Sequence, residues 1–415
     1  MVGATVIAMT RLSVVDEMFL HRHRGSGLPS VMQGVWRTDD TVHAPLLISL
    51  HDALSQGPLG RRVVRARIPG ARPRFVPSTH SYPLRYPSEK VSDDAIVEWA
   101  DAQVEVDLDP ERGPGWSLVA AHLAGGGTLV SLVCSHVLTD ARGLIDAVAQ
   151  ALAGNTEPHD ESRTSDLRDA LHVARTVARG LRGVRRSRTR EKPSIPLSVG
   201  LRPRTALIDV PSEEWDTAAG IGDGTANSLM LAIASGIARR AGIPLPLEIS
   251  IPVDDRDSNT VSNGVSMTGI TVDADDTVAT LRAKAALAYR KPREGAPHGI
   301  PAEIVQLVPD RFAARMARGA GERDMLCSNI GRVPAVLDAF GPHRTTGVAM
   351  RAMHPGLGTR DATTSTRLST YLCSRDDRYT LAVVALDEER FPDTQALRSF
   401  IDAEFAERGL HATYW

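Results

Sequence analysis

The chain has 415 residues, of which 42% are hydrophobic, so it can bury substantial cores and does not have the composition of a disordered protein. Its formal net charge is -2, so no overall field draws it toward nucleic acid, and we expect no nucleic-acid partner. Three cysteines, Cys134, Cys327 and Cys373, lie far apart in sequence and predict buried apolar side chains rather than disulfides or a zinc site. His21 and His23 have no further ligands at metal spacing, so we expect no bound metal.

No segment approaches the roughly 18 continuous apolar residues that a membrane-spanning helix needs. Residues 1–10 are mildly apolar, but they lack a basic start and a long hydrophobic core. We therefore expect a cytoplasmic protein that is neither secreted nor membrane-spanning.

Two apolar runs, 116–123 and 128–134, predict a β-hairpin. The residues between them, 124–127, read Ala-Gly-Gly-Gly, and glycine supplies the positive φ that a tight reversal needs. A helical pattern follows at 144–152, so the residues between the second strand and this helix form a strand-to-helix junction. Such junctions often carry functional residues.

His136 lies at this junction and shares a strand face with buried aliphatic residues. With an ordinary pKa of about 6.5, an imidazole can accept a proton from a hydroxyl or an amine, so His136 is a candidate general base. Asp140, four residues later, is better suited to fixing the loop by pairing with a cation, and we interpret it as a scaffold residue. The pattern alone is also compatible with a structural role, in which a half-buried histidine is hydrogen-bonded to backbone groups.

Residues 161–203 predict a basic helical linker between two halves, 1–160 and 204–415. Apolar residues recur at helical spacing from Leu167 to Val184, and a proline-containing exit follows. The basic residues on the opposite face and just after it are Arg175, Arg179, Arg182, Arg186, Arg188, Arg190 and Lys192.

Beyond the linker, strands and helices alternate, which predicts a mixed α/β fold. The predicted strands are 205–210, 245–253, 265–272, 325–328, 368–373 and 381–386, and the predicted helices are 225–240, 276–289 and 393–408. Gly242 and Gly409 follow the first and last of these helices, where glycine commonly caps a helix end.

Several short motifs occur in a characteristic order. They are Leu12-Ser13-x-x-Asp16-x-x-Phe19-Leu20, Trp116, Ser135-His136-x-x-x-Asp140-Ala141, the run 225–232, Pro252-Val253-x-x-Arg256, Asn263-Gly264-x-Ser266 and Ser328-Asn329-x-Gly331. Together they resemble the condensation-domain, or chloramphenicol-acetyltransferase-like, superfamily of acyltransferases. The wax ester synthase/diacylglycerol acyltransferase branch and the mycobacterial polyketide-associated acyltransferases are the most similar branches.

This resemblance implies that His136 assists attack of an acceptor hydroxyl or amine on an acyl thioester. The thioester would be carried by coenzyme A or by the phosphopantetheine of a carrier protein, as a co-substrate, with no bound cofactor. It also implies that Asp140 is structural and pairs with Arg256.

The resemblance also implies that Asn263, Ser328 and Asn329 line the region where the two substrates meet, as donors or as loop fasteners. Turn residues at strand ends are the alternative. Ser135 is a fourth candidate for this substrate-binding set. Because it faces away from His136 by strand alternation, we expect it to pack or to form a hydrogen bond, and no Gly-x-Ser-x-Gly elbow favours it as a nucleophile.

Three positions depart from the family pattern. Ser135 stands where the family has its first motif histidine, Ala141 where it has glycine, and Ser228 where an aspartate is usual. Ala141 matters only if that position needs a positive φ, in which case Gly143 could take over the turn.

The resemblance implies two α/β sandwich halves in a V, with a tunnel between them. We expect an enzyme that transfers an acyl group from acyl-coenzyme A to a hydroxyl, forming an ester, in lipid metabolism or natural-product biosynthesis. The alternatives are carrier-protein-dependent ester or amide condensation and a catalytically silent binding protein. The basic linker has three interpretations: a solvated helix, a peripheral membrane contact, and a site for coenzyme A phosphates or an acidic carrier protein.

Overall fold

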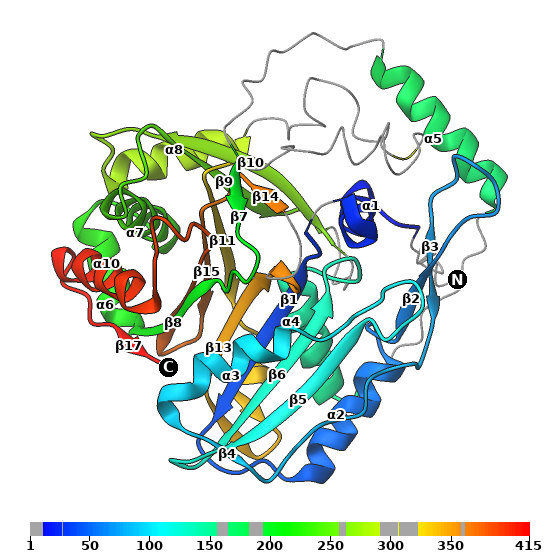
Figure 1. Cartoon of the computed structure of the whole chain (residues 1–415), viewed down its shortest axis with the longest axis horizontal. Helices are drawn as coiled ribbons and strands as arrows, with labels where there is room; N and C mark the ends of the chain where they lie inside the picture. The colour runs from blue at the N-terminus through cyan, green and yellow to red at the C-terminus, as the bar shows by residue number, and fades with distance from the viewer. Residues whose placement is uncertain are drawn as a thin grey trace, which may run out of the picture.

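The computed structural model describes residues 11–26, 28–155, 165–181, 194–256, 263–290, 306, 323–357 and 362–415. These residues form two lobes, each built on one large β-sheet with helices packed against it (Figure 1). The predicted mixed α/β, two-lobed architecture is therefore confirmed. The tunnel between the lobes stays a prediction.

The sheet of the first lobe has six strands. They are β1 (Val31–Thr38), β4 (Lys90–Val91), β5 (Trp116–Leu123), β6 (Thr128–Ser135), β12 (Ala339–Phe340) and β13 (His343–Met353). Their order is β12-β13-β1-β6-β5-β4. β5 and β6 form the predicted hairpin, with Trp116 opposite Cys134, and Gly126 and Gly127 have φ values of 102° and 93° in its turn.

Helices cover both faces of this sheet. The helices α2 (Ala44–Gln56) and α4 (Ala141–Leu152) bury leucine and valine side chains in a core on one face. The helix α3 (Ile96–Val104) packs on the other face, where Ala100 is fully buried. Both faces of β5 and β6 are therefore buried, which explains why these strands appear in the sequence as continuous apolar runs.

The second lobe contains a seven-stranded sheet. Its strands are β8 (Arg204–Pro211), β9 (Leu247–Asp254), β10 (Val265–Val272), β11 (Met325–Arg332), β15 (Leu368–Ser374), β16 (Arg378–Ala385) and β17 (Thr413–Tyr414), in the order β10-β9-β11-β15-β16-β8-β17. Its helices are α6 (Ser212–Ile221), α7 (Ala226–Arg240), α8 (Val278–Arg290) and α10 (Thr394–Glu407). They share one apolar core with the sheet, and Gly242 and Gly409 adopt positive φ after α7 and α10 as predicted.

The strand β13, from the second half of the chain, belongs to the first sheet. β13 pairs along its length with β1, with Val35 opposite Ala349, although β13 lies between β11 and β15 in sequence. The predicted division into 1–160, 161–203 and 204–415 follows chain order, whereas the first sheet takes residues from both ends of the chain. Hydrogen-bonded β structure therefore joins the second half of the chain to the first.

A further core lies between the two sheets and contains one buried charged network. Val35 of β1, Ala349 of β13 and Leu207 of β8 all belong to this core. Within it, Arg351 is 1% exposed, pairs with Asp101 of α3 at 2.6 Å and donates from Nε to Gln33 at 2.8 Å. Asp101 Oδ2 also accepts from Thr205 of β8 at 2.7 Å, so this network connects α3 of the first lobe to the sheet of the second.

Smaller elements surround the two sheets. They are α1 (Val14–His21), the following turn Arg22–Ser26, the hairpin of β2 (Arg61–Val64) and β3 (Arg74–Pro77), the short helices Asp93–Ala95 and Ala335–Asp338, and the pair β7 (Ile195–Leu197) and β14 (Ala362–Thr364). In the predicted linker, a helix α5 (Asp166–Leu181) is present, and residues 182–193 lie outside the described part. Among the described residues, no helix has the length and apolarity required to cross a bilayer.

Candidate functional site

His136 directly follows β6 and lies in the loop that leads to α4, at the strand-to-helix junction predicted from sequence. Its backbone N–H donates to Ser30 O at 3.0 Å, which continues the pairing of β6 with β1 by one residue. The side chain is half-buried. The sheet therefore fixes the start of this loop, and His136 is its first residue.

The imidazole of His136 lies in an apolar environment. The ring of Phe19, from α1, stacks on it with the centroids 3.7 Å apart and the planes 14° from parallel. Burial lowers the pKa of His136 to about 4, although the nearby negative charge of Asp140 opposes this shift. His136 is thus neutral near pH 7, which is the state that a general base needs.

Asp140 caps the N-terminus of α4 and holds its loop against the second lobe. Its Oδ1 accepts from Gly143 N at 2.9 Å, which caps the helix, and also from Arg256. Its Oδ2 accepts from Gly264 N at 3.0 Å. The side chains of Asp140 and Arg256 are each 6% exposed. The carboxylate oxygens are thus used by helix, arginine and backbone groups, which is the geometry of a scaffold.

Asn263 forms a second connection between the lobes. Its Nδ2 donates to His136 O at 2.8 Å and to Asp16 Oδ1 at 2.6 Å. Asp16 is buried in the first turn of α1, where it and Ser13 form a capping box. Burial raises the pKa of Asp16 despite the hydrogen bond from Asn263. α1, the His136 loop and the start of β10 therefore meet at one side chain.

Arg61 is a further support that our sequence analysis did not identify. Its Nη2 donates to Leu138 O within the His136 loop, and its guanidinium lies 4.0 Å from the centroid of the Phe75 ring. Burial lowers its pKa to about 10, so it remains charged at neutral pH. No motif or spacing pointed to Arg61, because its partner is a backbone carbonyl on a segment 77 residues away.

No protein-family model and no curated protein sequence matches this chain. Solved structures match over nearly its whole length. The first condensation domain of the CDA synthetase has a TM-score of 0.62 at 14% identity, covering 96% of both chains. The wax ester synthase/diacylglycerol acyltransferase from Marinobacter aquaeolei VT8 has a TM-score of 0.56 at 15% identity, covering 96% of this chain and 98% of that one. Polyketide synthase associated protein 5 from Mycobacterium tuberculosis has a TM-score of 0.57 at 13% identity, covering 95% and 96%.

This chain has the condensation-domain fold. The superfamily suggested by the sequence motifs and the branches that they resemble are both represented among these structures. At such low identity the match establishes the fold and leaves the substrates open.

Within this condensation-domain fold, the departures from the family motifs have structural explanations. Ala141 is the first residue of α4 and Gly143 is inside it, and neither has a positive φ, so no special turn is needed at either position. Ser228 completes a capping box on α7, where its Oγ accepts from Thr225 N at 2.8 Å. Ser135 Oγ accepts from Val137 N at 3.4 Å, within the His136 loop.

The remaining predicted site residues are less closely tied to the loop. Asn329 is exposed, and its Oδ1 accepts from Gly331 N at 3.0 Å, which makes it a fastener of its own turn. Ser328 is half-buried on β11, opposite Tyr371 of β15. The structure thus brings Asp140, Arg256 and Asn263 together around the His136 loop, whereas Ser328 and Asn329 lie on β11.

Glu17 is a second buried carboxyl group on α1. It is 5% exposed, and its Oε1 accepts from Gln306 Nε2 at 3.0 Å. Burial raises the pKa of Glu17 to about 8, partly offset by that hydrogen bond. Glu17 is thus mostly protonated at neutral pH and adds little negative charge beside the site.

Within the described ranges, the side chains form neither a metal site nor an activated cysteine. No cluster of three or more His, Cys, Asp or Glu residues there could hold a metal ion. The three cysteines are buried, and burial raises the pKa of each to about 12, so none is an activated nucleophile.

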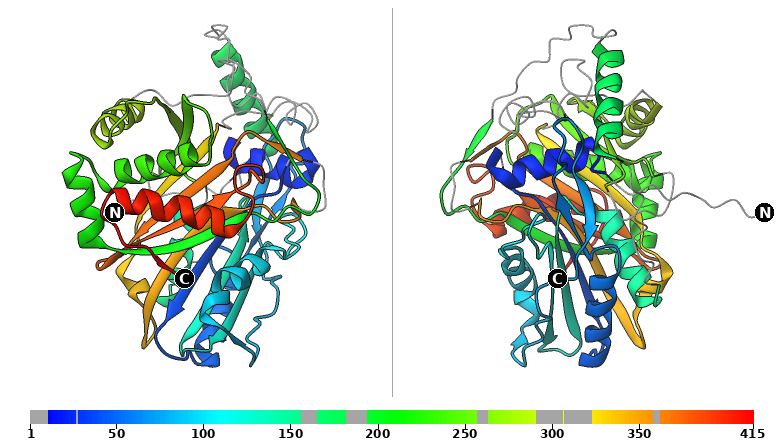
Figure 2. Two further views of the ribbon diagram at one scale, coloured as in Figure 1. Left: turned by 60° about the vertical axis from the view of Figure 1, so that its left-hand side comes forward. Right: turned by 90° about the vertical axis from the view of Figure 1, so that its right-hand side faces the viewer.

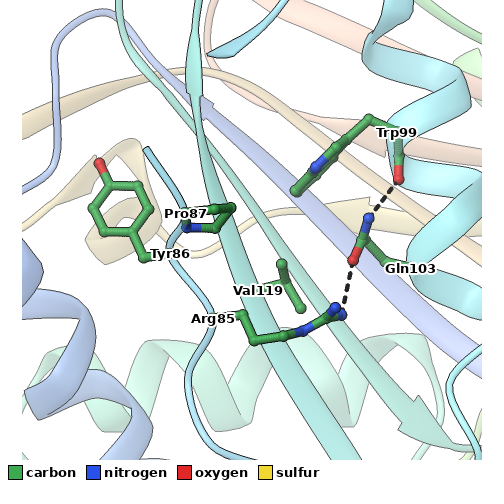
Figure 3. A pocket seen from close by; sticks show the side chains of 6 residues that line it. All are labelled: Arg85, Tyr86, Pro87, Trp99, Gln103 and Val119. Atoms are coloured by element: carbon green, nitrogen blue, oxygen red, sulfur yellow. Dashed lines mark hydrogen bonds between the residues drawn. The ribbon is translucent and has the colours of Figure 1, made fainter. Parts of the chain in front are cut away.

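A cavity of about 510 Å³ lies on the α3 side of the first lobe (Figure 3). Arg85 donates to Gln103, and Gln103 donates to the carbonyl of Trp99, across one wall. Val119 also lines it, and this residue pairs with Ser131, four residues before the end of β6. The cavity is therefore separate from the His136 loop.

Proposed function

We propose that this chain is an acyltransferase that moves an acyl group from a thioester, acyl-coenzyme A in the first instance, to a hydroxyl, forming an ester. His136 is the general base in this proposal. The observation that carries it is a neutral imidazole, shielded by Phe19, in a loop that side chains from both lobes hold in place. The condensation-domain fold supports the reaction class.

In the proposed reaction, the acceptor hydroxyl gives its proton to His136 while its oxygen attacks the thioester carbonyl. The carbon–sulfur bond then breaks, and the departing thiolate takes the proton from the imidazolium, so no proton is consumed overall. Nδ1 of His136 is buried and has no hydrogen-bond partner among the described residues, so we assign Nε2 as the atom that faces the acceptor. No covalent acyl-enzyme is needed.

Asp140 and Arg256 are positioning residues in this proposal. Their ion pair holds the C-terminal end of the loop, and Arg256 also pairs with Asp254 at 2.9 Å. Because a rigid loop keeps His136 within reach of the acceptor proton, the pair contributes to the rate through orientation.

Asn263 is the substrate-binding candidate with the best support. Its Nδ2 is used by the protein, but its Oδ1 is buried and has no partner in the described part of the chain. This buried oxygen gains a hydrogen bond when the hydroxyl or amine of the second substrate binds beside it and donates to it. Ser135, Ser328 and Asn329 remain weaker candidates for substrate binding, since two of them already accept local hydrogen bonds.

The test is release of free thiol from acyl-coenzyme A donors of increasing chain length, with pooled alcohols, sterols, glycerides and amines. We expect release that depends on the acceptor in wild type and is lost in His136→Ala. His411→Ala is the matched control, because its side chain is 84% exposed and lies on the second lobe. Release that is unchanged in folded His136→Ala would overturn His136 as the base.

Carrier-protein-dependent condensation is the second candidate. The observation that favours it is the match to a condensation domain of the CDA synthetase. Thiol release from an acyl-loaded carrier protein, with none from any acyl-coenzyme A, would select this candidate. Folded wild type that is inactive with both kinds of donor would select the catalytically silent binding protein.

A further inference from the structure

The helix α5 has an apolar face and a basic face that both point to solvent. Leu167 is 57% exposed and Leu171 is 48% exposed. Together with the exposed Ala174 and Ala178, they recur at spacings of four, three and four, which forms one strip along the helix. Neighbouring exposed apolar side chains on one helix face form a patch, and exposed apolar patches mark interaction sites.

A basic row runs beside this strip. It consists of the exposed residues Arg168, His172, Arg175 and Arg179. The acidic residues of α5 are on its other side, where Asp169 is 3% exposed beside the buried Val173 and Val177. The helix therefore has three sectors, one buried, one basic and one apolar and exposed.

The tip of the β2–β3 hairpin extends this surface. Arg67 N donates to Asp166 Oδ2 at 2.8 Å, and Arg72 pairs with Asp169 at 2.7 Å, so the hairpin and the first turn of α5 are in direct contact. Ile68 at the hairpin tip is 36% exposed. Residues 61–77 include six arginines and no acidic residue.

We propose that Ile68, Leu167 and Leu171, with the arginines around them, form a surface that binds an anionic lipid membrane. We call it the α5 surface. An apolar strip flanked by a basic row is the arrangement with which helices lie in a membrane interface, with the aliphatic side chains among the lipids and the arginines at the phosphates. This proposal does not depend on the proposed acyl transfer.

Shape favours a membrane over an acidic protein partner. In both views of Figure 2, α5 stands out from the body of the molecule, and in Figure 1 the hairpin tip lies beside its first turn. A protruding, convex element with aliphatic side chains fits the plane of a bilayer, whereas protein partners usually require a complementary, closely packed surface.

The α5 surface shares a support with the candidate site. Arg11 pairs with Asp166 at 2.7 Å, and Leu12 N donates to Pro73 O at 2.9 Å on the hairpin. These two residues precede Ser13, the N-cap of α1, and α1 carries Phe19. A membrane bound at the α5 surface would therefore lie on the side of the first lobe that holds α1.

The experiment is vesicle flotation of the full chain with phosphatidylcholine vesicles, with and without phosphatidylglycerol, at low and high ionic strength. We expect binding only to the anionic vesicles, weakening with salt. Leu167→Gln/Leu171→Gln and Arg175→Gln/Arg179→Gln should each weaken binding about tenfold or more. The matched controls are Leu287→Gln, an α8 leucine that is 60% exposed, and Arg239→Gln, an exposed arginine on α7.

Two further measurements separate this proposal from the enzymatic one. They are thermal melts of all variants and thiol release with soluble substrates in the absence of vesicles. We expect both to be unchanged in the four variants. No binding to anionic vesicles at low ionic strength would overturn the α5 surface, as would equal binding by the α5 and control variants. If the α5 variants lost binding to an acidic acyl carrier protein but still bound vesicles, the surface would be assigned to a protein partner instead.

Discussion

Phe19 and His136 are stacked face to face with their ring centroids 3.7 Å apart, although 117 positions separate them in the chain. Phe19 comes from α1, and His136 from the loop after β6. The contact excludes water from one face of the imidazole, and burial lowers the pKa of His136 to about 4. The aromatic ring thereby keeps the candidate base neutral over the physiological pH range.

Replacing Phe19 should therefore change the pH dependence of the reaction. Phe19→Ala exposes the imidazole to water, so we expect the pKa of His136 to rise by about one unit toward its ordinary value. Because the base acts only when deprotonated, kcat/KM should fall most between about pH 4 and pH 5 and be little changed above about pH 6.5. Phe19→Leu should give a smaller shift. Histidine NMR in the folded variants measures the pKa directly, and an unchanged value would contradict this account.

Replacing Asp140 should affect the fold as well as the activity. Asp140→Ala removes the cap of α4 and the buried carboxylate that faces Arg256, which should cost about 3 to 5 kcal/mol of unfolding free energy. His136→Ala should abolish activity with a melting temperature close to wild type. Urea unfolding and soluble yield provide the comparison.

A double variant separates the ion pair from direct chemistry. Asp140→Ala/Arg256→Met should recover part of the lost stability, because it removes both buried charges together. Fully stable but inactive Asp140→Ala would instead place the carboxylate in the reaction itself.

Asn263 should be required for both stability and rate. Asn263→Ala leaves the His136 carbonyl and Asp16 Oδ1 without their shared donor, at a cost of about 1 to 3 kcal/mol. Asn263→Asp should be worse, since it places a second carboxyl group against Asp16. Asn329→Ala is the control, because that side chain is exposed and bonds only its own turn. Equal melting temperatures for all three variants would rule out a structural connection through Asn263.

Glu17 should make the protein less stable as the pH rises. Its pKa is about 8 in the folded state and near 4.5 when unfolded, so between these values the folded chain holds the extra proton. The stability that this protonated group contributes is complete below about pH 4.5 and is lost as the pH rises toward 8. Glu17→Gln should remove this loss and stabilise the protein by up to about 3 kcal/mol at pH 7.

Urea unfolding of Glu17→Gln and wild type at low, neutral and high pH measures the effect. Glu98→Gln, at an exposed glutamate of α3, is the control and should follow wild type throughout. A constant stability difference between Glu17→Gln and wild type, independent of pH, would mean that Glu17 is already ionised in the folded state.

Local sequence was sufficient to predict the elements whose signals are close together in the chain. The Gly-rich turn between β5 and β6 and the glycines after α7 and α10 all act within a few residues. Periodicity and turn chemistry are local properties, which is why β10 was predicted at its observed bounds, 265–272. The motif order similarly indicated the fold, and it identified Asp140 and Arg256 as a pair.

Contacts between distant segments depended on the three-dimensional arrangement. β13 joins the first sheet by pairing with β1, and the residue pattern of β13 alone does not indicate this partner. The stacking of Phe19 on His136 and the bond from Arg61 to Leu138 O join segments of the first lobe that are far apart in sequence. The two-way donation of Asn263 arises only when the second lobe packs against the first. The pKa of His136 follows from the same packing, because desolvation depends on which side chains surround the ring and not on its neighbours in sequence.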